Sequence, residues 1–189
     1  MPPPLELPTI QNWSCHNCGG CCRQHAVEIT AAERDRILSQ NWQAGVDLPH
    51  TSPVIVTSGI WPQRSRYQLG HQPDGACVFL DERGLCRIHA RFGEAAKPLA
   101  CRLYPYAFHP AGRKITVSLR FSCPSVAANR GQSLVAQLDE LKMLEKLVVP
   151  EGAERIAPPA VLPGQQLDWG DTLAIADALD ELIAAGTET

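Results

Sequence analysis

The chain has 189 residues, a hydrophobic content of 44% and a formal net charge of −3. This length suits one domain with a small appendage, and the hydrophobic content is sufficient for a packed core. The negative net charge excludes the basic surface typical of nucleic-acid binding, and no apolar stretch approaches the roughly 20 residues that span a bilayer.

Residues 1–8 are rich in proline, which predicts an extended N-terminal arm. They lack the basic start and the apolar core of a secretory signal, so we expect a cytoplasmic protein whose thiols stay reduced. We expect a protein partner, and neither nucleic-acid nor membrane binding. In the cytosol an even number of cysteines is weak evidence for disulfides.

Four of the eight cysteines lie within the string CHNCGGCC at residues 15–22. At this chain's cysteine frequency, a C-x-x-C-x-x-C-C pattern would arise by chance on the order of once in a thousand such sequences. Thiolates ligate Zn²⁺ or iron–sulfur clusters, and two-residue gaps let neighbouring sulfurs converge on one centre. The candidate metal ligands are therefore all eight cysteines: Cys15, Cys18, Cys21, Cys22, Cys77, Cys86, Cys101 and Cys123.

A helix is predicted after the cysteine string. It begins at Thr30, because Thr30 and Glu33 match a capping box, and it ends near residue 41. Further along, β-prone runs at 54–57 and 66–69 predict short strands within an irregular segment.

Two strand predictions involve the later cysteines. Residues 77–80 and 85–88 flank a turn sequence, which predicts a hairpin that holds Cys77 and Cys86 at bridging distance. Polar and apolar residues alternate over 114–121, which predicts a half-buried strand that leads to Cys123.

Beyond Pro124 the chain contains no further cysteine or histidine. Leucines at three- and four-residue steps over 132–149 predict an amphipathic helix. A connector at 150–163 precedes a second helix, for which Asp171 is the expected N-cap. The apolar face of that helix would carry Leu173, Ala176, Leu179, Leu182 and Ile183.

Together these elements predict an α+β protein. We expect a small irregular cysteine-rich metal-binding domain with short antiparallel strands, followed by a C-terminal helical segment. The cysteine-cluster domain is placed at residues 1–130 and the helical C-terminal extension at 131–189.

The cysteine spacing favours an iron–sulfur cluster and leaves zinc as the alternative. Ferredoxin-like loops combine C-x-x-C-x-x-C with a remote Cys-Pro, which favours a [4Fe–4S] centre. The matching cofactor-binding set is Cys15, Cys18, Cys21 and Cys123. Structural zinc sites also combine C-x-x-C pairs with distant cysteines, so spacing alone does not separate the two metals.

Cys22 follows Cys21 directly, so the two side chains leave the backbone in different directions and would not share one four-thiolate ion. A second centre could use Cys22, Cys77, Cys86 and Cys101; alternatively, one or two cysteines are spare. His16, His25 and His89 lie beside cysteines, but a lone histidine is more often a surface or hydrogen-bonding residue.

The chain has no phosphate-binding loop, dinucleotide-binding, zinc-protease or nucleophile-elbow motif. It resembles the CxxCxxCC family of zinc- or iron-chelating proteins, the YkgJ-like cysteine-cluster group that includes flagellin N-methylases. The resemblance runs from about Cys15 to Ser125 and rests on several ordered motifs. These motifs are residues 15–22, 27–33, 75–89 and 97–105. Lys97 stands where the family usually has arginine, and His89 where it usually has an aromatic residue.

The resemblance implies metal or iron–sulfur binding and leaves open whether the chain is an enzyme. Our leading interpretation is an iron–sulfur protein with a redox or cluster-dependent role beside a protein partner. One alternative is a structural zinc-binding interaction module. Another, implied by the flagellin N-methylases, is a protein lysine N-methyltransferase, although the sequence points to no residues for a methyl-donor site.

Overall fold

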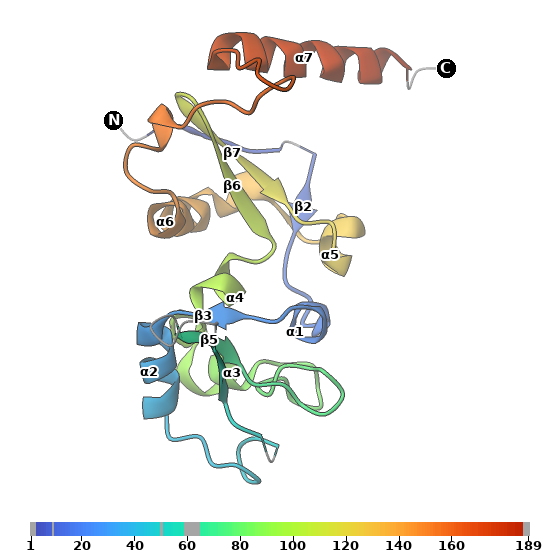
Figure 1. The fold of residues 1–189 in the computed structure, drawn as a ribbon. Coiled ribbons are helices and arrows are strands. Elements are labelled where there is room, and N and C mark those ends of the chain that lie inside the picture. Colours follow the sequence, from blue (N-terminus) through green and yellow to red (C-terminus); the bar gives the residue numbers. More distant parts are fainter. Residues whose placement is uncertain (1–2, 9, 50, 59–64, 187–189) are drawn as a thin grey trace. The chain divides into compact units, whose positions relative to one another are not determined.

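The structure of the chain is a computed structural model (Figure 1). It describes residues 3–8, 10–49, 51–58 and 65–186. Helices and short strands in small sheets both occur, which confirms the predicted α+β class and the C-terminal helix.

The chain divides into two compact units. One combines residues 11–106 with 119–132, contains all eight cysteines, and is called the cysteine unit here. The other combines residues 1–10, 107–118 and 133–189 and is called the helical unit. The domain boundary predicted after residue 130 concerns independent folding and stays a prediction.

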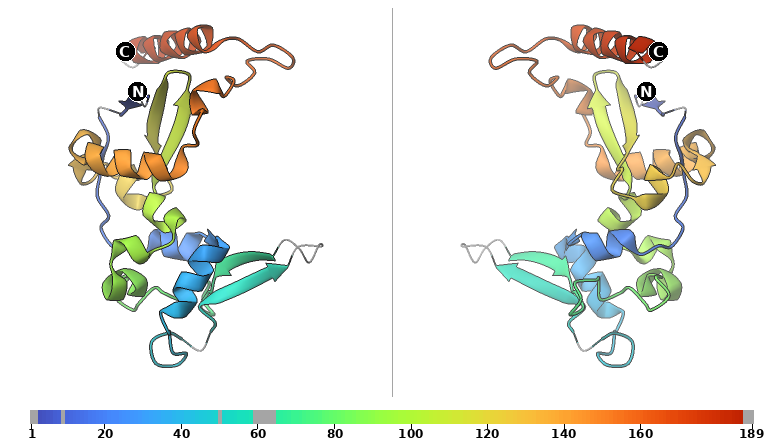
Figure 2. Two further views of the ribbon diagram at one scale, coloured as in Figure 1. Left: turned by 90° about the vertical axis from the view of Figure 1, so that its left-hand side faces the viewer. Right: turned by 90° about the vertical axis from the view of Figure 1, so that its right-hand side faces the viewer.

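The cysteine unit contains a three-stranded antiparallel sheet (Figure 2). Its strands are ordered β3 (Glu28–Ile29), β5 (Ser65–Leu69) and β4 (Val54–Ser58), and Ile29 of β3 lies opposite Tyr67 of β5. Both short strands expected in this part of the chain are thereby confirmed.

Helix α2 (Ala31–Ser39) begins with the expected capping box. The Thr30 Oγ1 accepts from the Glu33 N–H at 3.2 Å, and a Glu33 carboxylate oxygen accepts from the Thr30 N–H at 2.8 Å. The other Glu33 oxygen accepts from the Leu99 N–H at 2.7 Å, where helix α4 (Leu99–Leu103) begins. One acidic side chain therefore joins the first turns of two helices.

The hairpin predicted over residues 77–88 forms only in part: its turn and the antiparallel Leu80–Cys86 bridge are present, but the two longer strands are not. The Gly84 N–H donates to the Asp81 carbonyl at 3.0 Å, as the turn requires, but the flanking residues form a single isolated β-bridge. The chain then continues as helix α3 (Arg87–Phe92) rather than as a returning strand.

Hydrogen bonds to other segments explain why the pairing does not extend to Cys77 and Val78. The Cys77 N–H donates to the Cys22 carbonyl at 2.7 Å, and the Val78 N–H donates to the Gly70 carbonyl at 2.9 Å. Val78 and Phe79 are both fully buried, whereas successive residues of a half-buried strand point to opposite faces. The segment is therefore an irregular stretch through the core.

The remaining elements of the cysteine unit are short. Helix α1 (Gly20–Gln24), the 3-10 turn η1 (Glu94–Ala96) and helix α5 (Pro124–Ala127) all lie close in sequence to cysteines. Strand β2 (Asn12–Trp13) precedes the cysteine string, and β8 (Gln132–Ser133) marks the passage of the chain into the helical unit.

The helical unit contains a second small sheet. Its strands are ordered β1 (Leu5–Glu6), β7 (Lys114–Leu119) and β6 (Tyr106–Ala111), and β1 runs parallel to β7. Ile115 and Val117 of β7 are buried, while the residues between them are partly exposed. This alternation confirms the predicted half-buried strand.

The expected amphipathic helix forms from two segments, η2 (Leu134–Gln137) and α6 (Leu138–Val148). Its buried leucines are Leu134, Leu141 and Leu144. Leu147, also expected on the apolar stripe, is 52% exposed. A 3-10 turn, η3 (Ala153–Arg155), interrupts the connector that follows.

Helix α7 (Trp169–Gly186) begins three residues earlier than expected. An Asp168 carboxylate oxygen accepts from the Asp171 N–H at 2.9 Å, so Asp168 is the cap and the prediction of Asp171 is wrong. The Trp169 Nε1 donates to the Ile156 carbonyl at 2.7 Å, and this tertiary contact holds the first turn.

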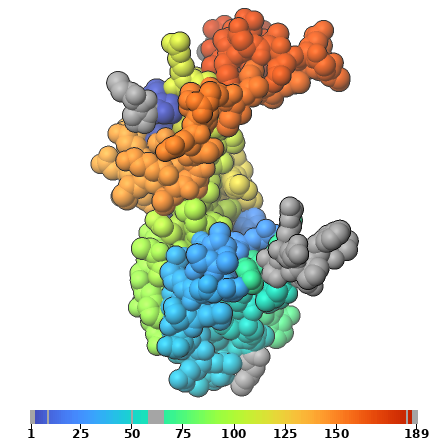
Figure 3. All heavy atoms as spheres, turned by 60° about the vertical axis from the view of Figure 1, so that its left-hand side comes forward, coloured from blue at the N-terminus to red at the C-terminus, as the bar shows by residue number. Residues whose placement is uncertain are grey.

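Most described residues of α7 are exposed, and Figure 3 draws this helix at the red end of its colour scale. Leu179, Leu182 and Ile183, which were expected on one apolar face, are 55%, 69% and 66% exposed. Within the described residues, no helix combines the length and apolarity needed to cross a membrane.

Candidate metal centre

Four cysteines from distant parts of the chain meet at the core of the cysteine unit. We call them the inner group: Cys22, Cys77, Cys86 and Cys101. Cys77 is a buried member of the hydrophobic core, and the other three pack against that core as partly buried side chains. The inner group coincides with the second ligand set that the sequence allowed.

The thiols of the inner group lie within electrostatic reach of one another. Burial raises the pKa of Cys77 to about 11, and the charge of Cys86 acts in the same direction. Burial likewise raises the pKa of Cys101 to about 12, with a further contribution from Cys77, while the Lys97 cation lowers it. In the metal-free protein these buried thiols therefore hold their protons at neutral pH.

The sulfur atoms of Cys21 and Cys22 on α1 lie 3.9 Å apart, and one thiol donates a hydrogen bond to the other. The hydrogen bond from Cys22 lowers the pKa of Cys21 to about 6. The same hydrogen bond, followed by burial and by the charges of Cys21, Cys77 and Cys86, raises the pKa of Cys22 well above its ordinary value. The shared hydrogen bond therefore favours a thiolate at Cys21 and a protonated thiol at Cys22.

A second gathering of cysteines surrounds Tyr104. Burial raises the pKa of Tyr104, and the charges of Cys123, Cys21 and Cys18 act in the same direction, so these three thiols lie within its electrostatic reach. We call them the outer group. Cys21 belongs to it and also lies beside the inner group.

Local contacts hold the outer group together. A Cβ built on Gly20 would lie 3.5 Å from the Cys18 sulfur and 3.6 Å from the Pro124 ring, so both flank Gly20 closely. The His16 Nδ1 and the Ser125 Oγ are 3.0 Å apart, which joins the cysteine string to α5. These contacts bring the segment that contains Cys123 and Pro124 to the cysteine string.

Cys15 differs from the other members of its predicted set. Its side chain is exposed, and its thiol donates to the Asn17 side-chain oxygen within the same loop, over 3.7 Å. All eight cysteines are free thiols. In the part of the chain that the structure describes, no three Cys, His, Asp or Glu side chains form a ready metal site. The ligand assignments stay predictions.

Two buried arginine donors that follow cysteines of the inner group in sequence would suit a negatively charged metal centre. The Nε atoms of Arg87 and Arg102 are buried and have no hydrogen-bond partner in the described structure. Each arginine directly follows a cysteine of the inner group in sequence. Buried donors are nearly always paired, and a thiolate–metal centre would supply both the acceptors and the counter-charge.

Sequence reasoning gave His25 and Tyr104 little weight. The two rings pack with centroids 5.1 Å apart, and the His25 Nε2 is buried without a hydrogen-bond partner. The signal in the sequence was the four-residue step from Cys21 to His25, which is the length of one helical turn.

The raised pKa values predict opposite pH dependences for the metal-free and the metal-loaded protein. Unfolded thiols ionise near pH 8.5, whereas Cys77 and Cys101 hold their protons to about pH 11 and 12 when folded. The unfolding free energy of the metal-free protein should therefore fall between pH 9 and 11, by up to about 1.4 kcal/mol per pH unit for each thiol. Below pH 8.5 the lowered pKa of Cys21 reverses the sign, because stability then decreases with falling pH.

In the metal-loaded protein, protons compete with the metal for the thiolates, so its stability should rise with pH from about 5 to 8 and should not fall above pH 9. Urea unfolding of both forms across this range measures the two slopes. A metal-free protein whose stability stays constant between pH 9 and 11 would contradict the burial of the two thiols.

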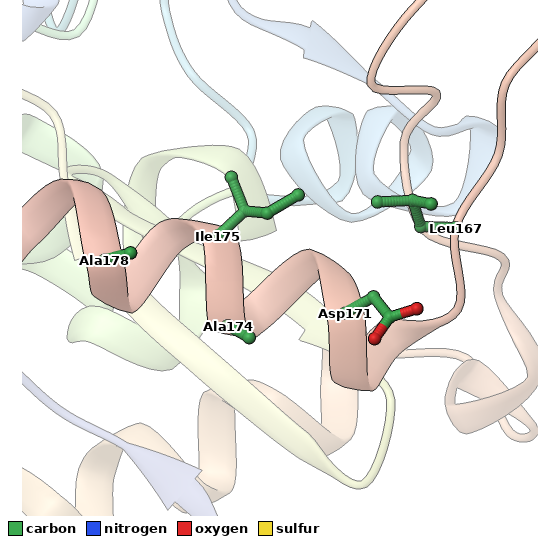
Figure 4. A pocket seen from close by; sticks show the side chains of 5 residues that line it. All are labelled: Leu167, Asp171, Ala174, Ile175 and Ala178. Atoms are coloured by element: carbon green, nitrogen blue, oxygen red, sulfur yellow. The ribbon is translucent and has the colours of Figure 1, made fainter.

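A hollow of about 430 Å³ lies beside α7 (Figure 4). Its lining residues are Leu167, Asp171, Ala174, Ile175 and Ala178. The lining includes a single carboxylate and no cysteine or histidine, so this hollow offers no thiolate ligands.

Several known proteins are similar to parts of this chain. A lysine-N-methylase of Salmonella choleraesuis is 29% identical over 146 residues, which cover 75% of this chain and 35% of that protein. A lysine-N-methylase of Salmonella typhimurium is 29% identical over 77 residues, which cover 41% of this chain and 18% of that protein. The flagellar biosynthetic protein FliU of Salmonella muenchen is 35% identical over 54 residues, which cover 29% of this chain and 32% of that protein.

The matched regions thus amount to about a third or less of each of these relatives. No solved structure matches significantly. Residues 14–124, more than half of the 189, match a family model described as "Putative zinc- or iron-chelating domain". The protein therefore belongs to the CxxCxxCC family, whose shared feature is this cysteine-rich metal-chelating domain.

Proposed function

We propose that the protein holds an iron–sulfur cluster through its cysteines and has a redox or cluster-dependent role beside a protein partner. In this proposal the inner group ligates one centre, and Cys15, Cys18, Cys21 and Cys123 ligate another. A cytoplasmic location, where thiols stay reduced, would suit eight free cysteines.

The observation that carries the proposal is the convergence of the inner group. Its members come from α1, from the irregular core stretch, from the start of α3 and from α4, yet their charges influence one another. Burial disfavours the thiolate form of these side chains, and a bound cation or cluster would compensate for it by taking the place of their protons. A metal centre is therefore the chemistry that this core supports best.

Two features favour iron–sulfur over zinc. The first is the ferredoxin-like spacing, in which the string at residues 15–21 combines with the remote Cys123-Pro124. The second is the presence of buried donors without acceptors near cysteines, on His25, Arg87 and Arg102. An iron–sulfur cluster offers inorganic sulfides as acceptors in addition to its thiolates, and hydrogen bonds to these sulfurs tune its potential. Zinc bound to four thiolates offers fewer acceptors.

Purification without oxygen tests the proposal directly. Iron, zinc and acid-labile sulfide are measured per chain, together with the visible spectrum. We expect roughly four irons and four sulfides for each occupied centre and a broad absorbance in the blue. Stoichiometric zinc without sulfide would overturn the iron–sulfur proposal and would favour a structural zinc-binding interaction module.

The names of the relatives favour a second candidate function, lysine N-methylation. This chain matches only part of those proteins, so it could supply the metal-binding portion of such an activity. The test is binding of S-adenosylmethionine to the metal-loaded chain, measured by calorimetry. Binding that is lost when the metal is removed would support a methylase role, and absence of binding would leave the redox role.

A further inference from the structure

We infer that His25 is a positioning residue of the outer group, and that its Nε2–H donates a hydrogen bond to a sulfur atom of the metal centre bound there. This inference deepens the proposed function and rests on it. It assigns His25 no bond to the metal itself.

The backbone places His25 beside the outer group. His25 follows the last residue of α1, and its N–H donates to the Cys21 carbonyl at 3.1 Å. That bond closes the last turn of α1, so His25 lies one helical turn beyond Cys21, at the point where the backbone becomes extended. Cys21 is the member of the outer group nearest to His25 in sequence.

Tyr104 fixes the imidazole from the other side. The two ring centroids are 5.1 Å apart and the ring planes are inclined by 56°. The Tyr104 hydroxyl and the Ser122 hydroxyl are 3.2 Å apart, and Ser122 directly precedes Cys123. His25 therefore packs on a ring that reaches from α1 to the remote cysteine of the outer group.

The buried Nε2 of His25 lacks a hydrogen-bond acceptor, and a metal centre bound at the outer group would provide one. The His25 Nε2 is buried and has no hydrogen-bond partner in the described structure. Leaving a buried polar group unpaired costs about 1–3 kcal/mol, and the face of Tyr104 is at best a weak acceptor. The nearby groups that gain negative charge when metal binds are the sulfurs of the outer group. An imidazole with its proton on Nε2 would donate to one of these sulfurs, and the buried Nε2 would then have a hydrogen-bond partner.

Two substitutions separate the donor from the packing of the ring. His25→Phe keeps an aromatic ring against Tyr104 and removes the donor, whereas His25→Gln removes the ring and keeps an N–H donor. His109→Gln is the control, because His109 is exposed and its Nε2 pairs with the Ser118 hydroxyl at 2.8 Å. All variants are prepared as full chains in the metal-loaded form.

The main readout is the rate at which a chelator removes the bound metal, which works for iron and for zinc. Loss of a hydrogen bond to a metal ligand typically weakens metal affinity by about 10–100-fold. We expect His25→Phe to begin with wild-type metal content and to release the outer-group metal at least about tenfold faster. His25→Gln and His109→Gln should behave like wild type. If the centre is an iron–sulfur cluster, His25→Phe should also have a more negative reduction potential.

Three results would overturn the inference. The first is wild-type release and potential in His25→Phe. The second is absence of the outer-group metal from both His25 variants at the outset, which would make His25 a ligand. The third is equal destabilisation of the metal-free and metal-loaded His25→Phe proteins, which would make its role one of packing. Zinc in the wild-type protein would overturn the iron–sulfur proposal but not this inference. The rates at which a chelator removes the zinc would still test the role of His25.

Discussion

Cys77→Ser is expected to remove the metal of the inner group and to lower the melting temperature of the purified protein by about 10 °C or more. Cys77 is 5% exposed and belongs to the hydrophobic core of the cysteine unit. Metal binding and folding are coupled in thiolate sites, so loss of one ligand removes several kcal/mol of stability. In a chain of this size each kcal/mol corresponds to about 2–4 °C.

Ala76→Ser is the matched control for this substitution. Ala76 is the neighbouring residue, is 2% exposed, and can receive a buried hydroxyl while all eight thiols remain. Metal content and thermal unfolding of both variants are measured before and after chelation. The melting temperatures of the Cys77→Ser and Ala76→Ser proteins should differ strongly in the metal-loaded form and by only a few degrees in the metal-free form. Wild-type metal content in Cys77→Ser would exclude Cys77 as a ligand.

Phe79→Ala is expected to destabilise the protein by roughly 3–5 kcal/mol, which is the usual cost of truncating a buried phenylalanine. Phe79 is 1% exposed, and its ring packs edge-on against Trp42 with centroids 5.1 Å apart. Because Phe79 lies in the same core cluster as Cys77, the cavity should also weaken the inner group. We therefore expect faster loss of metal to a chelator.

Phe121→Ala is the control, because Phe121 is 65% exposed and its truncation removes little buried surface. Urea unfolding gives the stability of each variant, and chelator competition gives its retention of metal. A Phe79→Ala protein as stable as the Phe121→Ala protein would contradict the position of Phe79 in the core. A destabilised protein with unchanged metal release would show that the inner group does not depend on this packing.

The two groups of cysteines differ in exposure, which bears on how electrons would pass to a protein partner. The outer group includes the exposed Cys18, whereas the inner group is built into the core. Cys21 and Cys22 join the two groups through sulfur atoms 3.9 Å apart. We propose that electrons would enter or leave through the outer centre, because exposure brings it closest to a docked protein.

The sequence by itself determined the local features of this protein. The capping box at Thr30 and Glu33 involves residues three positions apart, and the alternation along β7 and the leucine stripe of α6 repeat over a few residues. Each depends on backbone geometry within one element, so it can be read from spacing alone. The string at residues 15–22 and the family motifs were equally local, and the family was recognised from them.

Only the tertiary structure decided which distant residues meet. The turn beside Cys86 forms as predicted, but the pairing of its flanks stops short because the Cys77 and Val78 N–H groups donate to other segments, and the chain continues as α3. Trp169 is held by Ile156, which moves the cap of α7 to Asp168. The gathering of Cys22 with the later cysteines, and of His25 with Tyr104, likewise depends on packing between elements far apart in sequence. Such contacts follow from burying one shared core, and no short pattern along the chain encodes them.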